Sequence, residues 1–327
     1  MFKKFQKLTL FLLTIFIIPI NTLAYSDKII VSGETVGIKL NTNGILIVGS
    51  YDINGHNTLV EAGLKSGDII NQINGKKVNK VENMINIIRN CNCDSLNINY
   101  TRNKENRKTN LSLYESGNSK KTGLYVKDSI SGIGTLTYID PNTKLFGVLG
   151  HEIVDTTTGE IINIDSGIIF DSKVTGITKS ERGNPGEKNA ILYNEKIEGN
   201  IYKNTNKGLF GKYTGSIEED NLYKVASIRD IKVGNAKILT VLSGTEVGQF
   251  SINILKVSET SDKLKNIEFE VTDKKLLDKS NGIIQGMSGS PIIQDDYIVG
   301  AVTHVVVEDP HKGYGILIEN MLEEGEN

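Results

Sequence analysis

The sequence predicts a mainly β protein with two folded domains behind an N-terminal targeting segment. A chain of 327 residues has room for roughly two domains. Glycine is abundant (33 residues), proline is scarce (5) and tryptophan is absent, which is typical of many short strands joined by glycine turns. The net charge of -2, without a basic helix or an aromatic-plus-basic stripe, argues against nucleic-acid binding.

Residues 1–24 have the features of a secretory signal. A basic start is followed by the apolar run Leu8–Ile18, by Pro19 and by the small-residue sequence Thr22-Leu23-Ala24. The run is shorter than a spanning helix needs, which favours a cleaved signal. Counting on through Leu23 lengthens the span and leaves an uncleaved membrane anchor open. In either case the rest of the chain crosses the membrane, so we expect a secreted or membrane-tethered protein.

The only cysteines, Cys91 and Cys93, are two residues apart. We expect this spacing to be too short for an ordinary disulfide, and two thiols without a histidine cluster do not make a zinc site. The sequence therefore predicts two incidental thiols, no metal site and no cofactor.

The first domain is predicted over residues 36–115, after a linker over 25–35. The run Ala62–Ile70 reads as a turn entering a strand, Asn74-Gly75 as a hairpin turn, and Val81–Arg89 as a helix with one apolar face. The sequence "EAGLKSGDIINQINGKKV" resembles the PDZ domain. Such domains bind a peptide carboxylate in a glycine-containing loop, and the peptide then adds as a strand to the sheet edge.

Val36, Gly37 and Ile38 match that loop. The glycine permits the backbone bend and the apolar neighbours line a pocket, so these three residues are the predicted peptide-binding site. The alternative is a PDZ fold that only docks on its own catalytic domain.

The second domain is predicted over residues 120–327, where strand-like runs recur throughout. About ten to twelve strands over this length suit a double barrel or a sandwich. Within it, "GIIQGMSGSPII" is similar to the serine motif of chymotrypsin-like peptidases, with Ser288 as nucleophile. The glycines allow a tight turn on which the backbone N–H groups of Gly286 and Ser288 hold the oxyanion.

A serine nucleophile needs a base, and the chain has four histidines. His151 follows a predicted strand and precedes the serine, which is the order found in chymotrypsin-like peptidases, so His151 is the predicted base. His304 lies in a strand after the nucleophile and is a rival base, a neighbour of the specificity pocket or a core histidine. His56 and His311 lie in loops.

Together these motifs resemble the stage IV sporulation protein B peptidases of endospore-forming bacteria. "GTLTYIDPNTKLFGVLGHEIVD", "GIIQGMSGSPII" and "GAVTHVVVEDPHKGYGILIENML" carry the resemblance. It implies a chymotrypsin-like double β-barrel and a signalling protease in the space between forespore and mother cell. Such a peptidase cleaves a membrane-bound regulator of an intramembrane protease and thereby activates late mother-cell transcription.

The family pattern implies Asp273 as the acid of the triad. A double barrel more often supplies the acid from between the histidine and the middle of the chain, where Asp155, Asp165 and Asp171 stand. Met287 occupies the position at which trypsin carries an aspartate that pairs with a freed N-terminus. Activation by that salt bridge is therefore not expected, and the PDZ domain is the candidate for control.

Two functions from different classes remain open. In the first, the protein is an active signalling peptidase whose partners are a protein substrate and a PDZ ligand, which can be its own chain. In the second, it is a PDZ adaptor with a degenerate protease domain.

Overall fold

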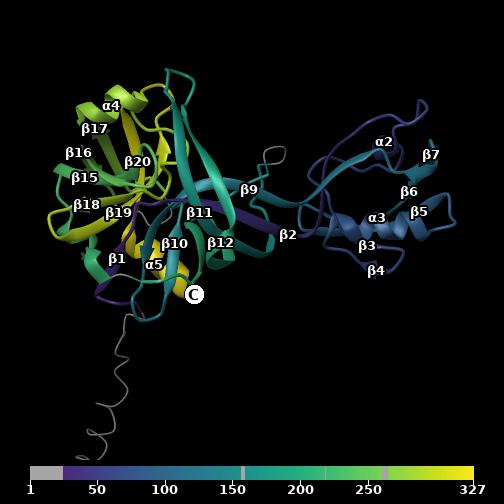
Figure 1. Cartoon of the computed structure of the whole chain (residues 1–327), viewed down its shortest axis with the longest axis horizontal. Helices are drawn as coiled ribbons and strands as arrows, with labels where there is room; N and C mark the ends of the chain where they lie inside the picture. Colours follow the sequence, from purple (N-terminus) through teal and green to yellow (C-terminus); the bar gives the residue numbers. More distant parts are fainter. Residues whose placement is uncertain (1–24, 156–158, 218, 260–263) are drawn as a thin grey trace, which may run out of the picture.

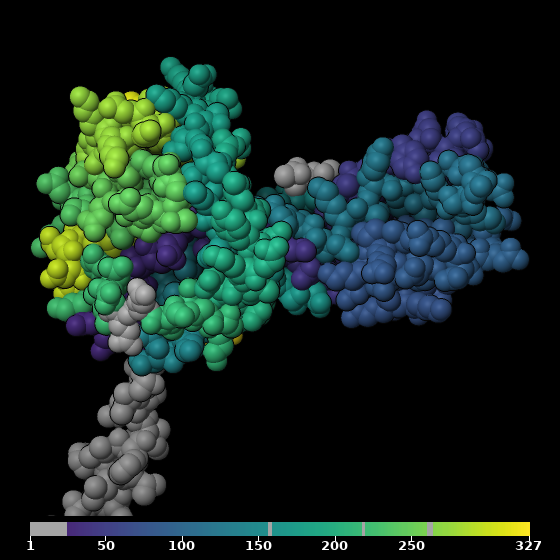
Figure 2. Space-filling model, in the orientation of Figure 1, coloured from purple at the N-terminus to yellow at the C-terminus, as the bar shows by residue number. Residues whose placement is uncertain are grey.

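The structure is a computed structural model that describes residues 25–155, 159–217, 219–259 and 264–327. The described chain forms a larger and a smaller body joined by a narrow waist (Figures 1 and 2). Both bodies consist mainly of β-strands, so the predicted fold class is confirmed. The targeting segment predicted over residues 1–24 lies outside the described residues. None of the helices in the described ranges combines the length and apolar character that crossing a membrane requires.

The smaller body contains the residues of the predicted PDZ domain. Its elements are the distal part of β2 (Thr35–Ser50), α2 (Thr58–Glu61), β3 (Ile69–Ile73), β4 (Lys76–Lys77), α3 (Val81–Asn90), β5 (Ser95–Arg102), β6 (Glu105–Ser112), β7 (Tyr114–Ser116) and β8 (Ser119–Lys121). Strand β3 pairs with β2 on one side and with β5 on the other. Asn74 and Gly75 both have positive φ and form the predicted hairpin turn between β3 and β4.

The larger body is built from long strands and carries the serine motif. Its elements are β1 (Lys28–Val31), the proximal part of β2, β9 (Leu124–Ile139), β10 (Leu145–Val148), β11 (Ile164–Thr178), β12 (Glu187–Thr205), β13 (Gly208–Tyr213), η1 (Glu219–Asn221), β14 (Leu222–Val225), η2 (Ile228–Asp230), β15 (Gly234–Val241), β16 (Val247–Val257), β17 (Ile267–Val271), α4 (Lys274–Ser280), β18 (Pro291–Gln294), β19 (Tyr297–Val305), β20 (Lys312–Leu317) and α5 (Ile318–Glu326).

The strand pairings close two barrels. The ring β2-β9-β10-β13-β12-β11 returns to β2, and the ring β15-β16-β17-β20-β19-β18 returns to β15. Closure leaves few free strand edges, which is how all-β proteins avoid exposed edges. The larger body is therefore a double β-barrel.

Each barrel has its own apolar core. Ile38, Phe146 and Ile169 are among the core residues of the first barrel, and Ile252 and Phe269 are among those of the second. A further cluster packs between the barrels and includes residues of β1 and α5. The sequence predicted a linker over 25–35, whereas Lys28–Val31 forms β1 and pairs with β9 and β14.

Two strands form the waist. β2 and β9 run antiparallel from the first barrel into the PDZ domain (Figure 1), with β11 beside β2 in the barrel and β3 beside it in the PDZ domain. The peptide-binding loop predicted at Val36, Gly37 and Ile38 is therefore wrong. These residues lie within β2 with a strand on each side, and a Cβ on Gly37 would lie 2.1 Å from the Phe170 ring.

Candidate active site

The serine motif forms a tight turn between α4 and β18. Gly286 and Gly289 have φ of 90° and 91°, a region that favours glycine. A Cβ on Gly289 would lie 2.1 Å from the Thr135 carbonyl oxygen and 2.6 Å from the Leu149 nitrogen. The glycine therefore allows the turn to approach the first barrel closely.

Ser288 is the accessible hydroxyl of this turn. It is half-buried, and its Oγ donates a hydrogen bond of 2.9 Å to the Thr303 carbonyl. Ser290 is fully buried, and its hydroxyl has no partner among the described residues. The structure therefore favours Ser288 over Ser290 as the residue that a substrate can reach.

The two N–H groups predicted to hold the oxyanion are unused. Within the described ranges, the N–H groups of Gly286 and Ser288 donate no hydrogen bond to the protein. The other N–H groups of the turn are all engaged, namely those of Gln285, Met287, Gly289 and Ser290. A main-chain donor without a protein acceptor is the arrangement that an oxyanion hole requires.

Strand β9 of the first barrel holds the turn in place. The Thr135 N–H donates to the Ser288 carbonyl (3.0 Å), and its Oγ1 donates to the Gly286 carbonyl (2.8 Å). Thr137 Oγ1 donates to the Gly289 carbonyl at 2.7 Å. Since these carbonyls are fixed by β9, the N–H groups on the opposite side of the turn are held as well.

His151 follows β10 through a backbone region of positive φ. Leu149 has φ of 72° and Gly150 of 71°, and a leucine in this conformation is uncommon and costs free energy, as is found at functional sites. His151 Nδ1 lies 2.7 Å from the Glu152 carbonyl oxygen. A carbonyl can only accept, so Nδ1 carries the proton and Nε2 is left as the basic nitrogen.

His304 lies beside His151. The ring centroids are 5.2 Å apart, and the neighbouring residue Thr303 supplies the carbonyl that binds the Ser288 hydroxyl. The structure therefore brings Ser288, His151 and His304 together, although Ser288 donates to Thr303 rather than to a histidine.

Burial keeps both rings neutral. It lowers the pKa of His151 below its usual 6.5, against the opposing effect of the Glu152 carbonyl. Burial, with smaller contributions from the nearby basic groups of His151 and Lys265, lowers the pKa of His304 to about 4. His304 Nδ1 is buried without a partner among the described residues. A neutral imidazole is the state that a general base requires.

Two known protein families match the sequence of this chain. The profile of the SpoIVB peptidase S55 family matches residues 118–322, and the profile of the PDZ domain matches residues 35–113. The chain belongs to the SpoIVB peptidase S55 family. It is thus a serine endopeptidase with a PDZ domain, as the sequence motifs indicated.

The S55 chain also resembles solved structures, all at low identity. The PDZ domain of an SdrC-like protein from Listeria monocytogenes is 18% identical (TM-score 0.23; 26% of this chain and 90% of that chain). The HtrA-type protease AlgW with a decapeptide is 10% identical (TM-score 0.35; 65% and 54%). An inactive form of Rv3671c from M. tuberculosis H37Rv is 12% identical (TM-score 0.31; 60% and 82%). No curated protein matches the chain.

Asp273, the acid that the S55 resemblance implied, caps a helix in this structure. Its Oδ1 accepts the N–H of Leu276 at 3.0 Å at the start of α4, and its Oδ2 accepts the N–H of Ser251 at 3.3 Å. No hydrogen bond or ion pair joins Asp273 to His151 within the described residues. The triad role of Asp273 stays a prediction, and the Glu152 carbonyl occupies the position of the third group at His151 Nδ1.

The alternative aspartates also lie elsewhere. Asp165 is exposed, and Asp171 forms an ion pair of 3.4 Å with Lys196. The N–H of Asp155 donates to the Glu160 carbonyl. Among the described residues, no hydrogen bond or ion pair joins Asp165 or Asp171 to His151.

Lys188 is a residue of this site that sequence reasoning missed. It lies under the serine turn: its N–H donates to the Gln285 carbonyl, and its side chain is 3.2 Å from the position of a Cβ on Gly286. Its Nζ is fully buried and donates to Thr35 Oγ1 (3.0 Å) and Thr240 Oγ1 (2.8 Å). Burial lowers the pKa of Lys188 to about 7. An isolated lysine in the sequence carries no signal of this environment.

Met287 is fully buried in the core of the second barrel. This side chain packs against apolar neighbours, and the expected absence of activation by a salt bridge stays a prediction. No group of three or more potential ligands for a metal ion occurs among the described residues.

A large cleft lies apart from the catalytic residues. It encloses about 1140 Å³ and is lined by residues of β1, β2, β11, β12 and β15, but by none of Ser288, His151 and His304. Figure 2 looks into this hollow, with the purple N-terminal residues at its floor.

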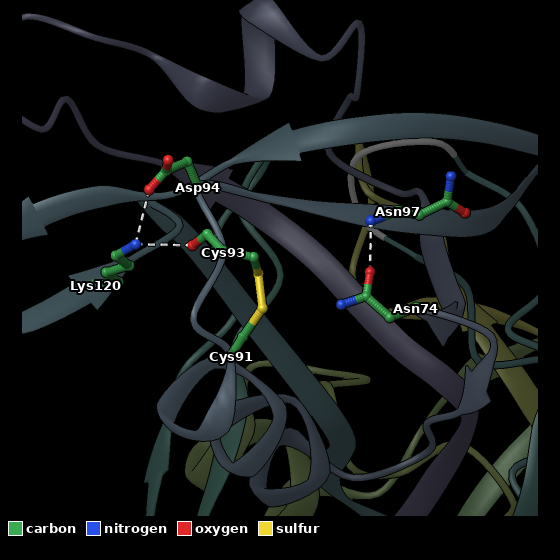
Figure 3. The surroundings of a disulfide bond; sticks show 6 residues. All are labelled: Asn74, Cys91, Cys93, Asp94, Asn97 and Lys120. Carbon is green, nitrogen blue, oxygen red and sulfur yellow. Dashed lines mark hydrogen bonds and ion pairs between the residues drawn. A yellow bond between two sulfur atoms is a disulfide. The ribbon is translucent and has the colours of Figure 1, made fainter.

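The two cysteines form a disulfide between α3 and β5 (Figure 3), so the prediction of two incidental thiols is wrong. The chain is extended there, which sets the Cα atoms of Cys91 and Cys93 5.2 Å apart, within the usual range for a disulfide. Lys120 Nζ anchors the segment by donating to the Cys93 carbonyl and to the Asp94 carboxylate.

The remaining histidines are exposed in loops, as predicted. His56 contacts Glu61 in the PDZ domain, and His311 contacts Asn281 after α4.

Proposed function

We propose that this S55 peptidase is a sporulation signalling protease in which Ser288 is the nucleophile and His151 the base. One observation carries the assignment of residues. Ser288, with two unused N–H groups beside it, binds the Thr303 carbonyl, and the next residue, His304, contacts the ring of His151, whose Nδ1 is fixed by a carbonyl. The Ser288 hydroxyl is accessible to a substrate. Because the proton of His151 is on Nδ1, Nε2 is the nitrogen that can accept the serine proton.

In the proposed reaction, the Ser288 hydroxyl turns from the Thr303 carbonyl toward His151 Nε2. Ser288 Oγ then attacks the scissile carbonyl while His151 takes its proton. The Gly286 and Ser288 N–H groups bind the resulting oxyanion, and one such donor contributes about 10²–10³ in rate. His151 next gives the proton to the leaving amine, and water hydrolyses the acyl-enzyme by the same steps.

The proposed substrate is a membrane-bound regulatory protein in the space between forespore and mother cell. Three features support this role: the S55 family itself, the signal-like sequence of residues 1–24, and a disulfide, since disulfides persist mainly outside the cytosol. The PDZ domain supports a protein substrate, because PDZ domains bind extended peptides.

Proteolysis of native membranes tests the role. Purified protein is incubated with membranes from sporulating cells, and the new N-termini are identified by mass spectrometry. We expect cleavage within the extracytoplasmic part of a membrane protein by wild type and by Ser290→Ala, and none by Ser288→Ala. Cleavage confined to soluble proteins would contradict the proposed substrate class, although not the peptidase chemistry.

A further inference from the structure

Strand β9 has a long free edge. On one side it pairs with β2 from Leu124 to Thr135. β1 continues this side at Tyr138 and Ile139. On the other side, β10 pairs with β9 only from Leu136 onward. From Leu124 to Thr135, no strand of the described chain pairs with the side of β9 that faces away from β2. Proteins usually protect such an edge, because it is a template for another strand.

The direction of the backbone groups on this edge follows from one contact. The Thr135 N–H donates to Ser288, and the Thr135 carbonyl accepts from Leu149, so both groups point away from β2. Backbone groups alternate along an antiparallel strand. The N–H and carbonyl groups of Ile133, Ser131 and Ser129 therefore point away from β2 as well, toward the free edge.

This edge is open to solvent near the catalytic turn. Ser131 and Gly132 are exposed, and a Cβ on Gly132 would meet no atom within 4 Å. Ile133 is half-buried, with its Cδ1 3.1 Å from the position of a Cβ on Gly286. The edge thus begins beside the oxyanion N–H groups.

The other end of the edge reaches the PDZ helix. The Asp128 carboxylate accepts the N–H of Val81, the first residue of α3, at 2.8 Å. β9 is therefore one continuous strand that contacts the serine turn at Thr135 and the start of α3 at Asp128. Figure 1 shows this strand running from the larger body to the PDZ domain. A second strand of similar rise would cover this distance with about seven residues.

We propose that the free edge of β9 binds the substrate segment that follows the scissile bond and leads it to the PDZ domain. This inference rests on the proposed roles of Ser288 and His151. His151 gives its proton to the leaving amine, so the leaving side lies over the barrel that carries His151. That barrel contains β9. The segment adds as a strand, bonded to the backbone at Ile133, Ser131 and Ser129, and about seven residues later it meets α3.

Peptide length tests the proposal without any variant. The best cleavage site that the full-length protein makes in reduced casein is mapped, and its peptide is synthesised with two, six or ten residues after the scissile bond. We expect kcat/KM to rise about tenfold from the shortest to the longest peptide, which corresponds to about 1.4 kcal/mol of added binding to the strand edge. Extension before the scissile bond serves as the control. Equal kcat/KM for all three peptides would overturn the proposal.

A proline at the edge provides the second measurement. Ser131→Pro removes an N–H that points away from β2 and leaves the β2 ladder intact, whereas Ser131→Ala keeps this N–H. The ratio of long-peptide to short-peptide kcat/KM is expected to fall several-fold in Ser131→Pro and to persist in Ser131→Ala. If folded Ser131→Pro keeps the wild-type ratio of long-peptide to short-peptide kcat/KM, the proposed binding of substrate along the free edge of β9 is contradicted. Loss of cleavage of every peptide by wild type would instead contradict the peptidase assignment.

Discussion

At the level of single residues, the chemistry depends on which nitrogen of His151 carries a proton. The Glu152 carbonyl fixes that proton on Nδ1 at 2.7 Å. In a Ser-His-Asp triad a carboxylate has this task and also stabilises the imidazolium. A carbonyl orients the ring but carries no full charge, and burial lowers the pKa of His151 against the opposing effect of Glu152.

The pH dependence of activity should reflect the lowered pKa of His151. Burial lowers the pKa of His151 below 6.5, so the neutral base persists as the pH falls through 6.5 and is lost only at lower pH. We expect the acid limb of the kcat/KM profile of a short peptide to lie below pH 6.5. An acid limb at or above that value would indicate a charged partner at His151 that the structure does not show.

Lys188 adds a residue-scale effect on stability. Its folded-state pKa of about 7 lies below the ordinary 10.5, so between these values the unfolded chain binds a proton that the folded chain does not. Stability therefore rises with pH across this window, and the cost of burying the charge is fully present below it. Each pKa unit corresponds to about 1.4 kcal/mol.

Lys188→Met tests this effect in the Ser288→Ala background, where self-digestion is prevented. Methionine has a similar length and carries no charge. We expect the unfolding free energy of the variant, relative to its Ser288→Ala parent, to be most favourable near pH 7 and to decline toward pH 10. Urea unfolding at both pH values measures it, and a difference that is independent of pH would be inconsistent with a neutral buried lysine.

At the level of elements, Asp273 has two alternative roles: the acid of the catalytic triad or the N-cap of α4. As the acid of a triad, Asp273→Asn would reduce kcat by about 10⁴. As the N-cap of α4, asparagine replaces aspartate well, whereas Asp273→Ala costs about 1 kcal/mol. From the capping geometry we expect Asp273→Asn to keep most activity and stability, and Asp273→Ala to lose stability.

The measurement is peptidase activity per folded molecule together with the unfolding free energy of both variants. Asp155→Asn is the matched control, because Asp155 lies on the loop after His151. A folded but inactive Asp273→Asn would show that the carboxylate reaches His151 in a conformation other than the one described.

Short sequence motifs correctly predicted the turns whose conformation depends on only a few neighbouring residues. The glycines around Ser288 indicated a tight turn, and Asn74-Gly75 indicated a hairpin, because positive φ is a property of single residues. Val36, Gly37 and Ile38 were misplaced because their environment is set by β9 and β11, which are distant in sequence. The contact between His151 and His304 and the burial of Lys188 arise from long-range packing in the same way.

At the level of the whole molecule, the two domains share strands rather than a flexible linker. β2 and β9 cross the waist together, and β9 fixes the serine turn through Thr135 and Thr137. The PDZ domain is therefore connected to the catalytic turn by one continuous strand and by the hydrogen bonds that this strand makes to the turn. This arrangement offers a means of control in a peptidase in which Met287 replaces the usual activating carboxylate.

The central claim is that Ser288 is an activated nucleophile, and fluorophosphonate labelling of the purified full-length protein tests it most directly. Only an activated serine reacts, and a PDZ adaptor with a degenerate protease domain would not be labelled. We expect labelling of wild type and Ser290→Ala, mapped to Ser288 by mass spectrometry, and loss of labelling in Ser288→Ala and His151→Ala. Removing the nucleophile from a catalytic unit lowers kcat by up to about 10⁶. A folded wild-type protein that is not labelled, or is labelled at another serine, would contradict the account.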